Sequence, residues 1–184
     1  AAGGPPPLVA LAAPTGKAAA RLEEAVHEQA AGLDVDDAIR DGLLDLRAST
    51  LHRLLGWRPD SQSRFRHHRG NRLPHDVVIV DETSMVSLSQ MARLLEAVRP
   101  QARLVLVGDP GQLTSIEAGA VLGDVVGPAD DDDAPTSGIG AGIVVLRSVH
   151  RYGGAIAAVA EAIRRGDGDA TVAALAESRD EVTW

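Results

Sequence analysis

Two adjacent carboxylates follow directly after a short run of β-branched residues. Asp81 and Glu82 come immediately after residues 77–80, which are Val-Val-Ile-Val. In a nucleotide hydrolase, an aspartate in this position can hold Mg²⁺, usually through its water shell, while the glutamate orients and deprotonates the attacking water. The plainer alternative is a pair of solvated acids in a loop that help to begin the next helix. The pair is a candidate hydrolytic site, and the rest of the sequence must decide between this role and a pair of solvated acids.

A polar turn after the apolar residues 103–107 carries a second group suited to nucleotide hydrolysis. Residues 108–111 are Gly-Asp-Pro-Gly, and Gln112 follows them. The amide of Gln112 can donate to a γ-phosphate oxygen and accept from the attacking water. Asp109 can form a turn with its own backbone or support the metal shell. A tight turn with an exposed glutamine is the alternative for this segment.

A phosphate-binding loop of the Walker A type is absent from the sequence. That motif requires Gly-x-x-x-x-Gly-Lys followed by Ser or Thr. Lys17 is the sole lysine of the chain and follows Gly16, but Leu11 occupies the upstream glycine position and Ala18 comes next. These 184 residues therefore lack the cradle that would hold the phosphates of ATP.

Short apolar runs alternate with segments of helical periodicity along the chain. The runs predict buried strands at residues 8–12, 77–80, 103–107 and 143–146. The periodic segments predict helices at residues 15–32, 36–47, 50–55, 87–98 and 155–165. Such alternation indicates an α/β fold with a parallel sheet, which binds ligands at the carboxyl ends of its strands. Both candidate groups follow predicted strands and therefore belong at that edge.

Charge is distributed unevenly along the chain. The formal net charge is −8, yet seven arginines and one acid, Asp60, lie between Arg47 and Arg72, which gives this segment a local charge of +6. A basic segment in an acidic chain indicates contacts with phosphates more directly than the total charge does. A GC-rich genome accounts for most of the preference for arginine over lysine. Residues 56–74 are polar and aperiodic, and we expect a loop or an arm there.

Composition excludes several classes of protein. There is no cysteine, which excludes disulfide frameworks, cysteine-ligated zinc and cysteine nucleophiles. The apolar run near the N-terminus, residues 8–13, is far shorter than the ~18 residues of a membrane span. It also lacks the positively charged start of a signal peptide. We expect a cytoplasmic protein with no membrane contact.

The motifs together resemble those of the RecD family. Its members are the α subunits of exodeoxyribonuclease V, and they belong to the superfamily 1 DNA helicases. Five blocks occur in the family's order. Residues 13–22 resemble motif Ia, 49–56 the small DNA-contacting motif, 78–85 the Walker B motif II, 107–124 motif III and 146–154 motif IV. Two departures are visible: Thr83 stands where the family often has alanine, and His150-Arg151-Tyr152 where it more often shows Tyr-Arg-Phe.

The resemblance implies a RecA-like parallel sheet with flanking helices, of the P-loop NTPase type. It also implies ATP-driven 5′→3′ movement on single-stranded DNA, with ATP and Mg²⁺ as cofactors. Asp81 would hold Mg²⁺, Glu82 would act as the base, Gln112 would sense the γ-phosphate and Arg151 would stabilise its developing charge. DNA contacts would come from Pro14, Thr15, Thr50 and His52. Capping of helices is the alternative role of the two threonines, and it is compatible with DNA contact.

The same resemblance implies partners and a domain plan. RecB-like and RecC-like subunits would complete a complex for double-strand-break repair and recombination, with nuclease activity in the RecB-like partner. Residues 1–126 would form part of a RecA-like helicase domain 1. The run of four aspartates at residues 130–133 itself predicts an acidic flexible insertion at residues 127–142. Residues 143–184 would be a motif IV segment leading into helicase domain 2. Because the family's Walker A motif lies just upstream of motif Ia, we expect an incomplete sheet and a fragment that is inactive alone.

Three other functions remain open or are disfavoured by the residues. A DNA-binding or scaffolding module without a motor fits the missing Walker A motif, although the Asp81-Glu82 pair argues against it. A stand-alone RecD-like helicase is also compatible with the motifs. A regulatory GTPase is disfavoured because the chain lacks both the phosphate-binding loop and an Asn-Lys-x-Asp segment.

Overall fold

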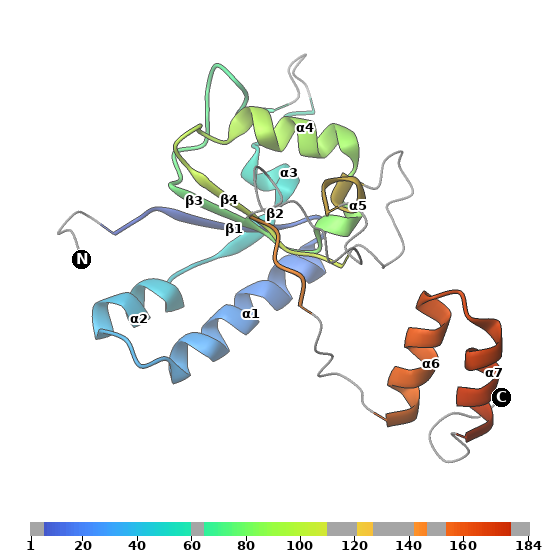
Figure 1. Ribbon diagram of the computed structural model, residues 1–184. Helices are drawn as coiled ribbons and strands as arrows, with labels where there is room; N and C mark the ends of the chain where they lie inside the picture. Colours follow the sequence, from blue (N-terminus) through green and yellow to red (C-terminus); the bar gives the residue numbers. More distant parts are fainter. Residues whose placement is uncertain (1–5, 60–64, 110–120, 127–141, 147–153, 178–184) are drawn as a thin grey trace. The chain divides into compact units, whose positions relative to one another are not determined.

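The structure, a computed structural model, describes residues 6–59, 65–109, 121–126, 142–146 and 154–177. These residues belong to two compact units, residues 1–128 and residues 129–184 (Figure 1). The first unit contains the sheet and most of the predicted site. The second contains a pair of helices.

Four parallel strands form the sheet of the first unit. They are β1 (Val9–Ala13), β2 (Ala48–Thr50), β3 (Val77–Val80) and β4 (Arg103–Leu106), in the spatial order β2-β1-β3-β4. Leu11 of β1 pairs with Ala48 on one side and with Ile79 on the other, and Ile79 pairs with Val105. The predicted α/β fold with a parallel sheet is confirmed.

Helices cover both faces of this sheet. Figure 1 shows α1 (Gly16–Gly32) and α2 (Asp37–Leu44) on one side, and α3 (Leu51–Leu54) and α4 (Leu88–Ala97) on the other. Side chains alternate between the faces along a strand, so Val78 and Val80 point into the core beneath α4, where Met91 and Leu94 meet them. Helix α4 begins after Ser87, whose hydroxyl accepts the N–H of Gln90 at 3.3 Å.

The edge strand β2 is a strand that the sequence did not predict. Residues 48–50 are Ala-Ser-Thr, which carry no apolar signal, but contacts with α1 tie this segment to the sheet. Glu23 of α1 accepts the N–H of Ala48 at 2.8 Å, and His27 bonds to the carbonyl of Leu46 at 2.9 Å. The N–H of Ala48, and then the Arg47 guanidinium, lower the pKa of the Glu23 carboxyl. The α1 side chains therefore fix the course of the chain into β2.

The other predicted elements lie close to their predicted bounds. The predicted helix 36–47 is observed as α2 at residues 37–44, and the predicted helix 50–55 as α3 at residues 51–54. A short helix, α5 (Val121–Val126), places Leu122 against the turn that follows β3. In the predicted arm, Trp57 bridges Phe65 and His68 bridges Asn71, both antiparallel.

The second unit differs from the prediction at its start. Residues 143–146, predicted as a strand, have no strand partner among the described residues, and Val144 and Leu146 are more than four-fifths exposed. A strand forms only where a neighbouring strand completes its backbone hydrogen bonds, so β-branched composition was insufficient. Helix α6 (Gly154–Arg164) matches its prediction and packs on α7 (Gly168–Glu177), which was not predicted. Asp167 caps α7 by accepting the N–H of Ala170 at 2.9 Å.

Candidate nucleotide and DNA site

The parallel sheet brings most of the predicted site residues to one edge. Pro14 and Thr15 follow β1, and Thr50 ends β2 and caps α3. Asp81 and Glu82 follow β3, which pairs directly with β1. The strand order therefore places the predicted DNA contacts over β2 and β1, and the carboxylates beside them over β3. The residues predicted for nucleotide hydrolysis and those predicted for DNA contact therefore lie at the same edge of one sheet.

Asp81 is fixed by its backbone and keeps one carboxylate oxygen available. Its N–H donates to the carbonyl of Ala12 in β1 at 2.9 Å. Its Oδ1 accepts the N–H of Glu82 at 2.8 Å, and Oδ2 has no hydrogen-bond partner within the part of the chain that the structure describes. The half-buried carboxylate can therefore act as an oxygen ligand without losing a contact that holds the turn.

Glu82 adopts a left-handed backbone conformation, with φ 51° and ψ 40°. No other non-glycine residue among those described has a positive φ. Such a conformation costs about 1–3 kcal/mol in a residue with a side chain, and it persists only where surrounding contacts impose it. Here the next residue imposes it. Thr83 is fully buried, its N–H donates to the carbonyl of Val107 at 2.9 Å, and its hydroxyl donates to the carbonyl of Val80 at 3.0 Å.

Gly108 allows the turn after β4 to lie against the turn after β3. A Cβ at this position would lie 2.8 Å from Cδ2 of Leu122, 3.0 Å from the backbone nitrogen of Thr83 and 3.1 Å from that of Ser84. Two of these neighbours are backbone atoms, which cannot rotate away. The absence of a side chain is therefore a condition of the contact, and Gly108 couples the segment that leads to Asp109 with the one that holds Glu82.

The predicted DNA contacts lie at the starts of two helices. Thr15 caps α1 by accepting the N–H of Ala18 at 3.2 Å, and Thr50 caps α3 by accepting the N–H of Arg53 at 3.2 Å. The capping role of both threonines is thus observed. The first N–H groups of the 17-residue helix α1 have no partner within the helix and carry the positive end of its dipole, which suits phosphate. His52 follows in α3, and its Nδ1 lies 3.3 Å from Nε2 of Gln90.

A cavity of about 340 Å³ opens between α1 and β2 beside these helix starts. Gly16, Thr50 and Arg53 line it near the residues predicted to contact DNA, and Glu23 and Glu24 line it farther along α1. The carboxylates disfavour a phosphate in the far part of the cavity. Only the end near Arg53 suits an anion.

The AAA domain family matches residues 2–184. The chain belongs to this family. Its relatives include the RecBCD enzyme subunit RecD of Mycolicibacterium smegmatis, which is 60% identical over 184 residues that cover all of this chain and 31% of that protein. The RecBCD enzyme subunit RecD of Haemophilus influenzae is 45% identical over 121 residues, 64% of this chain and 19% of that protein.

A third relative of this AAA domain is the ATP-dependent RecD2 DNA helicase of Deinococcus radiodurans. It is 43% identical over 114 residues, which cover 62% of this chain and 13% of that protein. These matches confirm the resemblance to the RecD family and the RecA-like, P-loop NTPase type of fold. The chain spans less than a third of the length of these relatives.

Two predicted site residues of the AAA domain, Gln112 and Arg151, lie outside the described residues. Their approach to Asp81 and Glu82 stays a prediction. From the sequence, Thr83 was only a departure from the family pattern, and Gly108 was predicted only to form part of a turn. Both lie in turns that follow strands, three residues after β3 and two residues after β4, but their contact depends on how closely the two turns approach each other.

The donors of this AAA domain fit a shared rather than a protein-enclosed Mg²⁺ site. Within the described ranges, no cluster of three or more His, Cys, Asp or Glu side chains could hold a metal ion. Mg²⁺ typically takes one or two carboxylates together with substrate phosphates and water. Asp81, with one oxygen available, suits that arrangement. In the same ranges, no helix is long and apolar enough to cross a membrane.

Proposed function

We propose that the chain forms part of the ATPase and DNA-binding surfaces of a RecD-type helicase subunit that moves 5′→3′ on single-stranded DNA. The subunit would assemble with RecB-like and RecC-like partners in the cytoplasm and act in double-strand-break repair and recombination. The observation that carries the proposal is the shared edge, where Asp81 and Glu82 lie beside the helix starts at Thr15 and Thr50. The names of the RecD relatives support the choice of complex.

In the proposed reaction, Asp81 would hold Mg²⁺, which would supply positive charge at the phosphate oxygens of ATP. Glu82 orients the attacking water and takes its proton, from a backbone conformation that Thr83 imposes. Gln112 contacts the γ-phosphate and the water, and the guanidinium of Arg151 matches the developing charge with its planar donors. The roles of Gln112 and Arg151 rest on the family resemblance.

The DNA side of the proposal uses backbone donors. Phosphates of the strand meet the N–H groups at the start of α1, next to Pro14 and Thr15, and the hydroxyl-capped start of α3 with His52. One hydrogen bond links the strands that lead to the two sites, because the N–H of Asp81 donates to the carbonyl of Ala12 in β1, two residues before Pro14. A shift of the nucleotide-side turn therefore acts on the chain that leads into the DNA-side helix.

The test is Glu82→Gln, made in this chain and in a RecD-type protein of the full length of the relatives. Glutamine preserves size and polarity but cannot take a proton. We expect ATP binding to persist and DNA-stimulated hydrolysis by the long protein to fall by about 10²–10⁴-fold, the usual contribution of a general base. The 184-residue chain should not hydrolyse ATP in either form. Glu28→Gln, an exposed glutamate of α1, is the control.

A DNA-binding or scaffolding module without a motor is the second candidate, favoured by the predicted DNA contacts at Thr15 and Thr50. It predicts that both proteins bind single-stranded DNA and that Glu82→Gln changes nothing. A stand-alone helicase is the third, supported by the RecD2 relative. In that case the long protein would unwind DNA without RecB-like and RecC-like subunits.

A further inference from the structure

Aromatic side chains are scarce in this chain, and two of them contact His52, one of the residues predicted to bind DNA. The sequence has two Trp, one Tyr and one Phe. Trp57 lies edge to face with the imidazole of His52, at a centroid distance of 6.2 Å and an angle of 89°. Phe65 lies 6.0 Å from the same imidazole, tilted by 40°. We name this group of His52, Trp57 and Phe65 the aromatic cluster.

Backbone hydrogen bonds hold Trp57 in place, although its side chain is half exposed. Its N–H donates to the carbonyl of His52 at 2.9 Å, and it bridges Phe65 across the arm. Gly56 makes the turn with a φ of +67°, where a Cβ would lie 2.7 Å from Cβ of Arg66. Trp57 itself is 52% exposed. The backbone of Trp57 is therefore held in place, and its indole contacts the imidazole of His52 while about half of the residue stays exposed to water.

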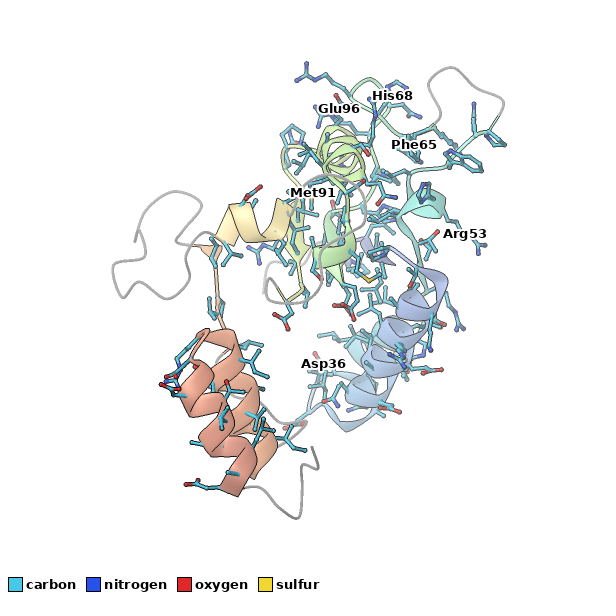
Figure 2. The ribbon with its side chains drawn as sticks, turned by 90° about the vertical axis from the view of Figure 1, so that its right-hand side faces the viewer. Asp36, Arg53, Phe65, His68, Met91 and Glu96 are labelled. Atoms are coloured by element: carbon cyan, nitrogen blue, oxygen red, sulfur yellow. The ribbon has the colours of Figure 1, made fainter. Side chains whose placement is uncertain are left out.

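The surroundings of the aromatic cluster are basic. Arg53, Arg58 and Arg66 come from the same helix and arm, and none forms an ion pair with a carboxylate among the described residues. In Figure 2, Arg53 and Phe65 lie on the same side of the first unit. Arginines around an exposed aromatic ring are typical of surfaces that bind single-stranded nucleic acid, where the arginines follow the phosphates and the rings stack on bases.

We propose that Trp57 is a stacking site for one unpaired base of single-stranded DNA. The inference rests on the proposed function, because the helix starts at Thr15 and Thr50 would bind the neighbouring phosphates. His52 connects the two, since it lies in α3, which Thr50 caps, and contacts the indole. Stacking on an indole accepts every base, so the site adds affinity without sequence preference.

The first experiment is a fluorescence titration in the Trp184→Phe background, which leaves Trp57 as the sole indole. An oligo(dT) of about 16 nucleotides should quench its emission, because a stacked base lies directly against the ring. Measured with labelled oligo(dT), Trp57→Ala should weaken binding about 5- to 150-fold, and Trp57→Phe should retain most of the affinity. Leu95→Ala, which removes a 55% exposed apolar side chain from α4, should change nothing.

A second oligonucleotide separates stacking from a structural role of Trp57. An abasic oligomer of the same length keeps every phosphate and removes every base. Wild type and Trp57→Ala should bind it equally, so the loss should appear only with oligo(dT). Equal weakening on both oligomers, or no effect on either, would overturn the stacking site while DNA binding by the wild type still upholds the proposed function. Failure of the wild type to bind oligo(dT) would refute both.

Discussion

Replacing Gly108 with alanine should destabilise the first unit and disturb the turn that holds Glu82. The added methyl would sit 2.8 Å from Cδ2 of Leu122 and 3.0 Å from the nitrogen of Thr83. The side chain of Leu122 can move, but the backbone of Thr83 is held by its hydrogen bond to Val107. Forcing a methyl into a packed site costs about 1–3 kcal/mol, and we expect a loss of unfolding free energy in that range.

Gly42→Ala provides the matched control with the opposite sign. Gly42 lies inside α2, and a Cβ there would meet no atom within 4 Å. Alanine in a helix interior is favoured over glycine by about 0.8–1.0 kcal/mol, so this variant should be more stable than the wild type. The assay is urea unfolding followed by Trp57 fluorescence in the Trp184→Phe background, since Trp57 belongs to the first unit. If Gly108→Ala matched or exceeded the wild type in stability, this result would contradict the close contact between the two turns.

Two further predictions concern the core and the sheet's amino end. Leu94→Ala should lower the unfolding free energy by about 2–5 kcal/mol, because the Leu94 side chain is fully buried. Leu95→Ala should change it by less than about 0.5 kcal/mol, because Leu95 is 55% exposed. Equal midpoints of urea unfolding for the two variants would contradict the orientation of α4. The N–H of Leu8 and the guanidinium of Arg99 lower the pKa of Asp76. A lowered folded pKa gives stability that is present above the unfolded value of about 3.9 and lost as pH falls through the folded pKa. The stability lost by Asp76→Asn should therefore be visible at neutral pH and vanish in acid, and a pH-independent difference would contradict this pairing.

The sequence predicted the elements whose signals are local. Residues 77–80 form β3, and α4 begins after Ser87 and ends at Ala97, as its periodicity and cap indicate. Strand β2 was missed because residues 48–50 become a strand only through Glu23 and pairing with β1. The strand predicted at 143–146 failed for the converse reason, since apolar residues there find no partner strand in the described part of the chain. Helix α7 was missed although Asp167 carries the usual capping signal.

The candidate site was predictable in its location and not in its geometry. Parallel strands fix which residues reach the carboxyl edge, so Asp81 and Thr15 could be placed from the sequence alone. The backbone conformation of Glu82 could not, because it depends on Thr83 reaching both Val80 and Val107. The aromatic cluster depends in the same way on a bridge across the arm, which local periodicity does not encode.

The left-handed backbone at Glu82 favours glycine at that position, whereas the proposed chemistry requires a carboxylate there. Glycine would relax that conformation, so a population selected only for resistance to heat would drift toward glycine there and lose the carboxylate. A chain that keeps glutamate is therefore retaining a residue that its own fold disfavours. Under the proposed function, position 82 gives up backbone stability in order to place a carboxylate beside Asp81.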